Sequence, residues 1–469
     1  MNMLRTILAL SVQLISMNAL ALIIGNEFHT ESLRQQKNYE RFFHQGFRTD
    51  GSPRIMDTLY FDQKLDHADA NSATFKQRYF VDSSYAADNN SPVFYIICGE
   101  WNCAGTGSYG YAEGLAKKNK AHLVALEHRY YGQSLPTTKL TPEILKHLDL
   151  ESAIEDLAQV QRHMMENRNL KGKWVAFGGS YAGTLAAYYR LKHPELIVGA
   201  LASSAPVLMK NEFFEYDAHI AKVIDRTQCG NKVREVVKLI EAKMSTPEGV
   251  SEVKALFSAS DIKEDRDFLY VVADMLAAAV QYGRDKVFCG ALEKNPDLIA
   301  GYADGGLKVL ASMGASPLEI SLQIAEKVET TPDDNMRQWM WQSCRQFGWF
   351  QVSNTRGSTS RSSQIDLKYH EDFCQRAYNI PMSTDGVMNG EWYSPLLDPA
   401  TSGIIFSNGG NDPWLTLSIT NGTSPVNPEL ALYMMDGAAH CNDLKAIASL
   451  PSIAAAQGEM AKIIASWIQ

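Results

Sequence analysis

One serine in this sequence, Ser180, stands where a nucleophile would be exposed. It lies within Gly178-Gly-Ser-Tyr-Ala-Gly183, between an apolar run at 174–177 and a helical pattern that continues to residue 191. A strand, a tight turn and a helix in this order form a nucleophile elbow, which exposes the serine Oγ and aims the helix N-terminus at a developing oxyanion. Ala182 stands where the G-x-S-x-G pattern has its second glycine, so the pattern is met in a relaxed form with a small residue. A structural turn with an exposed serine is the alternative interpretation.

A serine nucleophile needs a positioned imidazole to take its proton and an acid to orient that imidazole. In α/β hydrolases these partners follow in the order Ser, Asp or Glu, His. Asp412 follows an apolar run at 403–406, and His440 follows another at 430–434. Because α/β sheets place ligand sites at the carboxyl ends of their strands, both side chains should meet Ser180. We therefore predict Ser180 as nucleophile, His440 as general base and then acid, and Asp412 as the orienting acid.

Two other acidic residues stand near His440. Asp436 is the alternative orienting acid, but it lies only four residues before the histidine, too close to the strand end to reach behind the ring. Asp443 is more typical of a helix N-cap than of a catalytic acid.

We expect the oxyanion hole to combine the backbone N–H of Tyr181 with an N–H from the loop at 98–103, at Gly99 or Glu100. The side chain of Glu100 has two interpretations: it is a structural hydrogen-bond acceptor, or it is a charge that binds a substrate amine. The polar stretch 127–132 follows the next strand and predicts a buried hydrogen-bonded brace rather than a direct catalytic role.

The elements that must hold these residues alternate between strand and helix patterns. Strand runs are predicted at 59–61, 75–81, 93–97, 123–126, 174–177 and 198–202, and helices at 110–120, 150–167 and 184–191. This order predicts an α/β fold with a mostly parallel sheet and helices on both faces.

Residues 208–395 differ from this pattern. They are rich in charged amphipathic stretches such as 232–243 and 265–281 and show no paired apolar strand runs, which indicates a helical insertion. Strand patterns resume at 403–406 and 430–434, and a helix is predicted over 447–467. We therefore predict an α/β-hydrolase core in two parts, 26–207 and 399–469, around a helical, disulfide-containing cap at 208–398. The low-complexity patch Ser358–Ser363 predicts a solvent-exposed loop or a segment prone to proteolytic processing.

Composition excludes several classes of protein. The chain has 469 residues with 44 basic and 53 acidic side chains, a formal charge of −9. Nucleic-acid binding is not expected, because no run of lysine and arginine has the required density. Nothing after residue 25 approaches the ~18 consecutive apolar residues that a membrane span needs. The absence of a C-x2-C pair or of histidines at ligand spacing argues against zinc, and we expect no metal and no cofactor.

The N-terminal segment predicts export. Residues 1–25 carry one charge, Arg5, a largely apolar run and an Ala-Leu-Ala step, the pattern of a cleaved signal peptide that leaves no membrane anchor. An uncleaved anchor is the alternative, but Gln13 and Asn18 interrupt the apolar run. We therefore expect a secreted or lysosomal (vacuolar) protein. Two sequons, at Asn89 and Asn421, are candidate glycosylation sites.

Seven cysteines are expected to form three disulfide bonds in an oxidising compartment, with one left over. Sequence alone does not give the connectivity. From their proximity along the chain we predict Cys98–Cys103, Cys229–Cys289 and Cys344–Cys374. The remaining thiol, Cys441 beside the catalytic histidine, is expected to be buried and inert.

Several motifs together resemble a family of serine peptidases. They are Gly178-Gly-Ser-Tyr-Ala-Gly183, Glu127-His-Arg-Tyr-Tyr-Gly-Gln-Ser134, Ala202-Ser-Ser-Ala-Pro206, Asn411-Asp-Pro-Trp414 and Gly437-Ala-Ala-His440. Over residues 55–467 the chain resembles the family of lysosomal Pro-Xaa carboxypeptidase, dipeptidyl peptidase II and thymus-specific serine protease, and the segment from Trp339 to Gln351 looks most like the last branch.

This resemblance implies exopeptidase cleavage of peptides, commonly after proline, by an α/β-hydrolase core with a helical cap. It implies that Trp414 and Trp349 line the proline pocket. It also implies that Thr184 is a substrate-binding residue of that pocket, where it replaces a methionine of the carboxypeptidase. A homodimer is possible. Two other hypotheses compete with this one: an esterase or lipase on the same core, and a catalytically silent binding protein.

Overall fold

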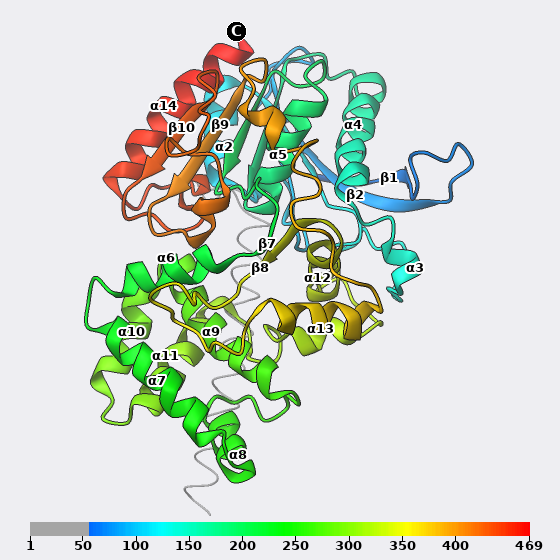
Figure 1. The fold of residues 1–469 in the computed structure, drawn as a ribbon. Helices are drawn as coiled ribbons and strands as arrows, with labels where there is room; N and C mark the ends of the chain where they lie inside the picture. The colour runs from blue at the N-terminus through cyan, green and yellow to red at the C-terminus, as the bar shows by residue number, and fades with distance from the viewer. Residues whose placement is uncertain (1–55) are drawn as a thin grey trace, which may run out of the picture.

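The computed structural model describes residues 56–469, and the predicted signal peptide at 1–25 together with residues 26–55 lies outside them. A sheet of eight strands forms the centre of the core, in the order β1-β2-β4-β3-β5-β6-β9-β10 (Figure 1). β1 and β2 are antiparallel to their neighbours, and the other strands run parallel. The strands are β1 (Asp57–Lys64), β2 (Thr74–Asp82), β3 (Val93–Ile97), β4 (His122–Leu126), β5 (Trp174–Gly179), β6 (Gly199–Ser203), β9 (Ile404–Gly409) and β10 (Ala431–Met435).

Helices cover both faces of this sheet, as the alternating pattern predicts. The core helices are α2 (Gly110–Asn119), α3 (Pro142–Leu145), α4 (Leu150–Asn167), α5 (Tyr181–Lys192) and α14 (Pro451–Ile468). α2 and α14 pack on one face and α4 and α5 on the other, so the sheet separates two apolar clusters. The central strands β3, β4, β5 and β6 are buried along their whole length, which explains their unbroken apolar runs. These observations confirm the predicted fold class.

The cap lies between β6 and β9 in the sequence and forms a separate body of helices in Figure 1. Its helices are α6 (Phe214–Ile224), α7 (Cys229–Lys243), α8 (Pro247–Leu256), α9 (Asp265–Gln281), α10 (Asp285–Lys294), α11 (Leu298–Met313), α12 (Met336–Gln342) and α13 (Leu367–Tyr378). The insertion is not entirely helical, because β7 (Lys210–Glu212) and β8 (Gly348–Phe350) pair in parallel within it. Both strands are three residues long, too short to leave a periodic signal.

All three predicted disulfide bonds are present: Cys98–Cys103, Cys229–Cys289 and Cys344–Cys374. The first braces the loop after β3, and the other two lie in the cap. Cys441 is a free thiol, but it is half-buried rather than buried as expected. Both sequon asparagines, Asn89 and Asn421, are exposed, and glycosylation there stays a prediction.

The serine-rich patch at 358–363 is exposed only at its ends, Ser358 and Ser363, and is not the wholly solvent-exposed loop that its composition predicts. Ser360, Arg361 and Ser362 are buried. The backbone N–H and the hydroxyl of Ser360 both donate to the carboxylate of Asp217 in α6. A buried carboxylate needs several donors, and this patch supplies them, which composition alone does not reveal.

Candidate active site

Ser180 lies at the sharp turn between β5 and α5. Its backbone has φ 59° and ψ −132°, a conformation that costs a non-glycine residue about 1–3 kcal/mol and persists where the surroundings enforce it. Gly178 is required by close packing, because a Cβ there would lie 1.9 Å from the carbonyl oxygen of Ala182. The methyl group of Ala182 itself fits, so the relaxed form of the elbow motif is sterically sound.

Asp412 and His440 form a buried pair at the ends of β9 and β10. The Nδ1 atom of His440 lies 2.8 Å from Oδ2 of Asp412, and the two side chains are 5% and 0% exposed. Oδ1 of Asp412 accepts from the backbone N–H of Trp414, 3.0 Å away, which fixes the carboxylate. Nε2 of His440 is buried and has no hydrogen-bond partner among the described residues, so it is free to take a proton.

The electrostatic state of His440 follows from this pair. Burial alone would lower the pKa of its imidazole, but the negative charge of Asp412 acts in the opposite direction, with a contribution from Cys441. The pKa of His440 therefore lies well above its usual value. The imidazolium that forms during proton transfer is stabilised by this carboxylate.

The turn at Ser180 and the loop at His440 are fastened to the same strand end, that of β6. The backbone N–H of Ser180 donates to the carbonyl oxygen of Ser203 at 2.9 Å, and that of Cys441 donates to Oγ of Ser204 at 2.9 Å. A Cβ on Gly179 would lie 3.0 Å from Sγ of Cys441, so the two loops are in close contact. The structure thus brings together the three residues predicted as a catalytic triad.

The cap completes the site through Gln281 at the end of α9. Its backbone carbonyl accepts from the N–H of His440 at 2.9 Å. Its side-chain Oε1 accepts from Nε1 of Trp414 at 3.0 Å and from the hydroxyl of Tyr216 at 2.7 Å. Sequence analysis missed Gln281, because a single glutamine at the end of an amphipathic helix carries no signal of its own.

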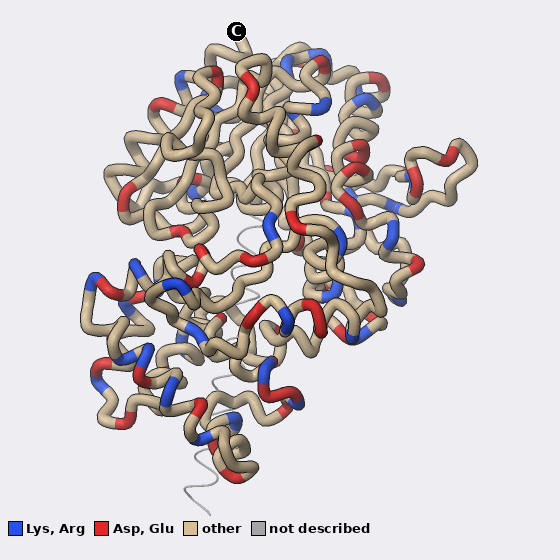
Figure 2. Tube along the Cα trace, in the orientation of Figure 1, with Lys and Arg blue, Asp and Glu red and all other residues tan. Residues whose placement is uncertain are grey.

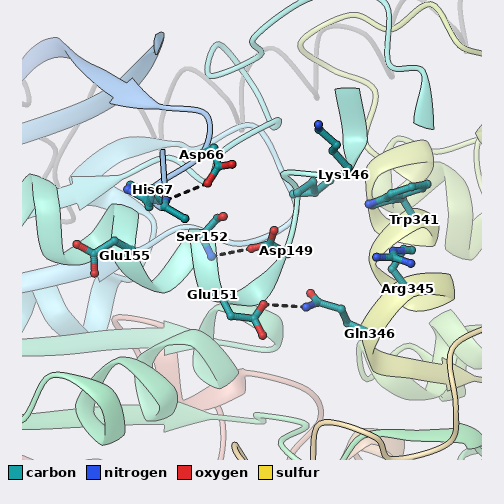
Figure 3. Close-up of a pocket in the computed structure, with 12 residues that line it drawn as sticks. Asp66, His67, Lys146, Asp149, Glu151, Ser152, Glu155, Trp341, Arg345 and Gln346 are labelled. Atoms are coloured by element: carbon teal, nitrogen blue, oxygen red, sulfur yellow. Dashed lines mark hydrogen bonds between the residues drawn. The ribbon is translucent and has the colours of Figure 1, made fainter. Parts of the chain in front are cut away.

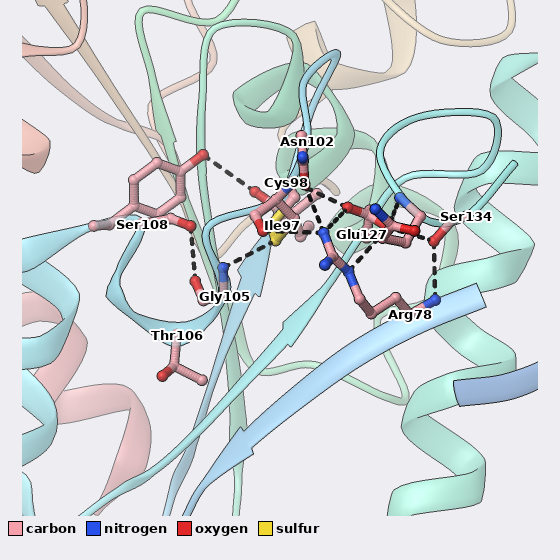
Figure 4. The surroundings of a disulfide bond; sticks show 12 residues. Arg78, Ile97, Cys98, Asn102, Gly105, Thr106, Ser108, Glu127 and Ser134 are labelled. Atoms are coloured by element: carbon pink, nitrogen blue, oxygen red, sulfur yellow. Dashed lines mark hydrogen bonds and ion pairs between the residues drawn. A yellow bond between two sulfur atoms is a disulfide. The ribbon is translucent and has the colours of Figure 1, made fainter. Parts of the chain in front are cut away.

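The predicted oxyanion loop lies against the first turn of α5. A Cβ on Gly99 would stand 3.3 Å from the backbone nitrogen of Ala182, so the loop and the helix N-terminus are in contact. Behind the loop lies the brace predicted at 127–132 (Figure 4). Glu127 is fully buried and accepts from the guanidinium of Arg78, the N–H of Cys103 and the hydroxyl of Ser134. Arg78 also donates to Oδ1 of Asn102 at 2.6 Å.

Tyr181, whose backbone N–H is the other predicted oxyanion donor, links the core to the cap through its side chain. Its hydroxyl accepts from Nε2 of Gln342 in α12 at 2.8 Å and lies 3.0 Å from Nε2 of His128. Oε1 of Gln342 accepts in turn from the hydroxyl of Tyr131. The residue after the nucleophile is therefore held by both parts of the protein.

An aromatic cluster stands beside the elbow. Trp414 and Trp349, both predicted to bind substrate, have ring centroids 6.1 Å apart, and Trp349 stacks on Phe347 at 4.6 Å. The ring centroid of the half-buried Trp339 lies 5.8 Å from that of Tyr181 and 5.9 Å from that of Trp349. Sequence analysis missed Trp339 as a site residue. The signal that could have indicated it is its position in the Trp-Met-Trp segment of the cap.

Two predicted roles are contradicted by the structure. Thr184 is fully buried, and its hydroxyl donates to the carbonyl oxygen of Pro206 at 2.8 Å, so it offers no surface to a substrate. Asp443 is not a helix N-cap: it is buried and accepts from the hydroxyls of Ser203 and Ser407, both at 2.6 Å. Asp436, the alternative acid, is exposed.

Another pocket, of about 490 Å³, lies away from this site (Figure 3). Its wall includes Glu151 at the start of α4 and Gln346 of the cap, joined by a hydrogen bond of 2.9 Å. None of the three triad residues lines it. Within residues 56–469 there is no cluster of three or more metal-ligating side chains, and no helix combines the length and apolar character needed to cross a bilayer. Acidic and basic residues are interspersed over this part of the chain (Figure 2).

A serine at the elbow after β5, with an acid and a histidine after two later parallel strands, defines a serine hydrolase of the α/β-hydrolase class. Residues 63–457 match the family described as Serine carboxypeptidase S28, and the chain belongs to this family of serine peptidases.

Three curated relatives illustrate the range of this family. The "Probable serine protease EDA2" of Arabidopsis thaliana is 34% identical, with 84% of this chain and 82% of the relative covered. The "Thymus-specific serine protease" of Mus musculus is 28% identical, with 87% of both chains covered. The "Lysosomal Pro-X carboxypeptidase" of Bos taurus is 27% identical, also with 87% of both covered.

Proposed function

We propose that this serine peptidase is an exopeptidase that cleaves peptides near one end, with a preference for proline at the cleaved bond. The observation that supports the proposal is the buried Asp412–His440 pair, whose Nε2 has no hydrogen-bond partner among the described residues and whose loop packs against the strained turn of Ser180.

In the proposed mechanism, Oγ of Ser180 attacks the scissile carbonyl carbon while Nε2 of His440 takes its proton. The N–H groups of Tyr181 and of Gly99 or Glu100 stabilise the oxyanion. His440 then gives the proton to the leaving amine, and the acyl group remains on Ser180. Water, deprotonated by His440, hydrolyses this acyl-enzyme and restores the serine. Asp412 orients the imidazole throughout and stabilises its charged form.

Two features support the selectivity. The half-buried ring of Trp339, backed by the buried rings of Trp349 and Trp414, gives a proline side chain a flat apolar surface to pack on, and one relative is named a Pro-X carboxypeptidase. The site lies between core and cap, since Gln281 and Gln342 of the cap contact His440 and Tyr181. Such an enclosed position favours the end of a short peptide over the middle of a folded chain.

We further propose that the protein acts in a secretory or lysosomal compartment. Its three disulfide bonds are typical of an oxidising environment, and one relative is named lysosomal.

The test is labelling with a fluorophosphonate, followed by mass spectrometry of a peptide library incubated with the protein and with Ser180→Ala. We expect covalent labelling of Ser180 and serine-dependent release of residues from one end of proline-containing peptides. Failure of the wild-type protein to cleave any peptide, despite labelling, would overturn the exopeptidase assignment in favour of an esterase. Absence of labelling would favour a silent binding protein.

A further inference from the structure

The turn that follows α9 contacts the loop of the candidate base at two points. The carbonyl oxygen of Gln281 accepts from the backbone N–H of His440 at 2.9 Å. Two residues later, a Cβ on Gly283 would lie 3.3 Å from the Cβ of Ala439. The residue between these two contacts, Tyr282, is therefore held against the same loop.

The backbone at Tyr282 is fixed by the end of the helix. Its N–H donates to the carbonyl oxygen of Ala278 at 3.0 Å, and the N–H of Gly283 donates to that of Val280 at 3.1 Å. Gly283 has a φ of 68°, the left-handed conformation in which glycine commonly ends a helix. The side chain of Tyr282 therefore starts from a rigid point rather than from a free loop.

The ring of Tyr282 packs against the candidate base itself. Its centroid lies 6.3 Å from that of the His440 imidazole, and the two ring planes meet at 82°, an edge-to-face arrangement. His440 is buried, whereas Tyr282 is 36% exposed. The tyrosine is therefore the member of this ring pair that a bound peptide can reach.

The mechanism brings the leaving residue to the same place. Nδ1 of His440 is occupied by Asp412, so Nε2 is the atom that gives the proton to the leaving amine. That amine must come within about 2.6–3.2 Å of Nε2 for the transfer. The side chain of the leaving residue starts two bonds from the amine nitrogen, which puts it beside the groups that border the imidazole. Tyr282 is an exposed aromatic side chain among these groups.

Resting on the proposed exopeptidase function, we propose that Tyr282 is a specificity-determining residue that packs against the side chain of the residue released with the leaving amine. Its ring favours an aromatic or large aliphatic side chain there over glycine or a charged one. The proline pocket then selects the residue before the cleaved bond, and Tyr282 selects the residue after it. The assignment holds for cleavage near either end of a peptide, because each cleaved bond has a leaving residue.

The test measures kcat/KM for peptides of one proline-containing sequence that differ only in the residue after the proline: phenylalanine, leucine, glycine or glutamate. For the wild-type protein we expect phenylalanine to be preferred over glycine by about 10-fold, the scale of one aromatic contact. In Tyr282→Ala this ratio should fall to within about 2-fold, because the ring is gone. Tyr282→Phe should keep the ratio, because it keeps the ring.

A matched control and a labelling experiment make the result specific. Tyr60 is also exposed, at 51%, but lies on the edge strand β1, so Tyr60→Ala should show the wild-type ratio. Fluorophosphonate labelling of Ser180 shows whether the catalytic residues of each variant remain assembled. Tyr282→Leu, which fills part of the same volume, should give an intermediate ratio and carries the test if Tyr282→Ala is not labelled.

The ratio separates this role from a merely structural one. A tyrosine that only shields the imidazole would lower kcat for all four peptides alike and leave their ratios unchanged. The proposal is overturned if a labelled Tyr282→Ala or Tyr282→Leu keeps the wild-type ratio, or if the wild-type protein does not distinguish the four leaving residues. Both results leave the exopeptidase function intact, because the peptides are still cleaved. Cleavage of no peptide by the wild-type protein would overturn the proposed function, and this assignment with it.

Discussion

Replacing Asp412 by asparagine tests the catalytic pair with little disturbance of its surroundings. Asparagine keeps an oxygen that accepts from the N–H of Trp414, but it puts an amide where His440 Nδ1 needs a negatively charged acceptor. Coulomb's law at an effective dielectric constant of about 20 gives about 6 kcal/mol for unit charges separated by the observed 2.8 Å. Because this attraction acts on the imidazolium formed in the transition state, kcat should fall by about 10⁴-fold.

The assay is steady-state hydrolysis of a proline-containing peptide, with active-site titration to count competent molecules. Asp436→Asn is the matched control, since Asp436 is exposed and stands four residues before the same histidine. We expect it to retain wild-type kcat. A loss of less than 10-fold in Asp412→Asn, or an equal loss in Asp436→Asn, would refute the assignment of Asp412.

The pH dependence of activity is a second test of the Asp412–His440 pair. In the wild-type protein the pKa of His440 is raised, so the base becomes protonated and activity falls as the pH drops through a value above the usual ~6.5. In Asp412→Asn the largest charge that raises the pKa of His440 is gone, while burial, which lowers it, and the smaller contribution of Cys441 remain. The acidic limb of kcat/KM should therefore move to lower pH. A limb that stays in place would show that another group titrates there.

Three further substitutions test the framework. Glu127→Gln breaks the buried pair with Arg78 and should lower the free energy of unfolding by about 3–5 kcal/mol, as measured by urea denaturation. Cys229→Ser opens the 60-residue loop closed at Cys289 and should cost about 4 kcal/mol in the chain-entropy account, so the cap should unfold at lower temperature in calorimetry. Gly178→Ala puts a methyl group 1.9 Å from a carbonyl oxygen of α5 and should abolish fluorophosphonate labelling; retained labelling would contradict the elbow geometry.

The positions of the candidate catalytic residues were predictable because each of them follows a local sequence pattern. The elbow couples a strand run, glycines and a helix within about twenty residues, and Asp412 and His440 each follow a short apolar run. The parallel sheet then brings these strand ends together, so their order along the chain is enough to assemble them. The prediction of α9 at 265–281 succeeded for the same reason, since its amphipathic period is local.

The errors concern residues whose role depends on distant parts of the chain. Asp443 was interpreted from its neighbours as a cap, but its partners, Ser203 and Ser407, lie on β6 and β9. Ser360 belongs to a segment that looks like a solvated loop, and only Asp217 in another helix explains its burial. Hydrogen bonds between side chains far apart in sequence leave no periodic trace, so these roles had to come from the structure.

The position of Gln281 shows that the cap helps to hold the candidate active site and does not only cover it. Gln281 accepts hydrogen bonds from the backbone N–H of His440 and from the indole N–H of Trp414. The proposed base and a wall of the proposed proline pocket are therefore fixed by the same helix end. On the other side, Gln342 holds the hydroxyl of Tyr181. A shift of the cap would therefore disturb the base, the pocket and the predicted oxyanion donor together. Because a displacement of about 1 Å can cost 100-fold in rate, peptide binding between core and cap is coupled to assembly of the site.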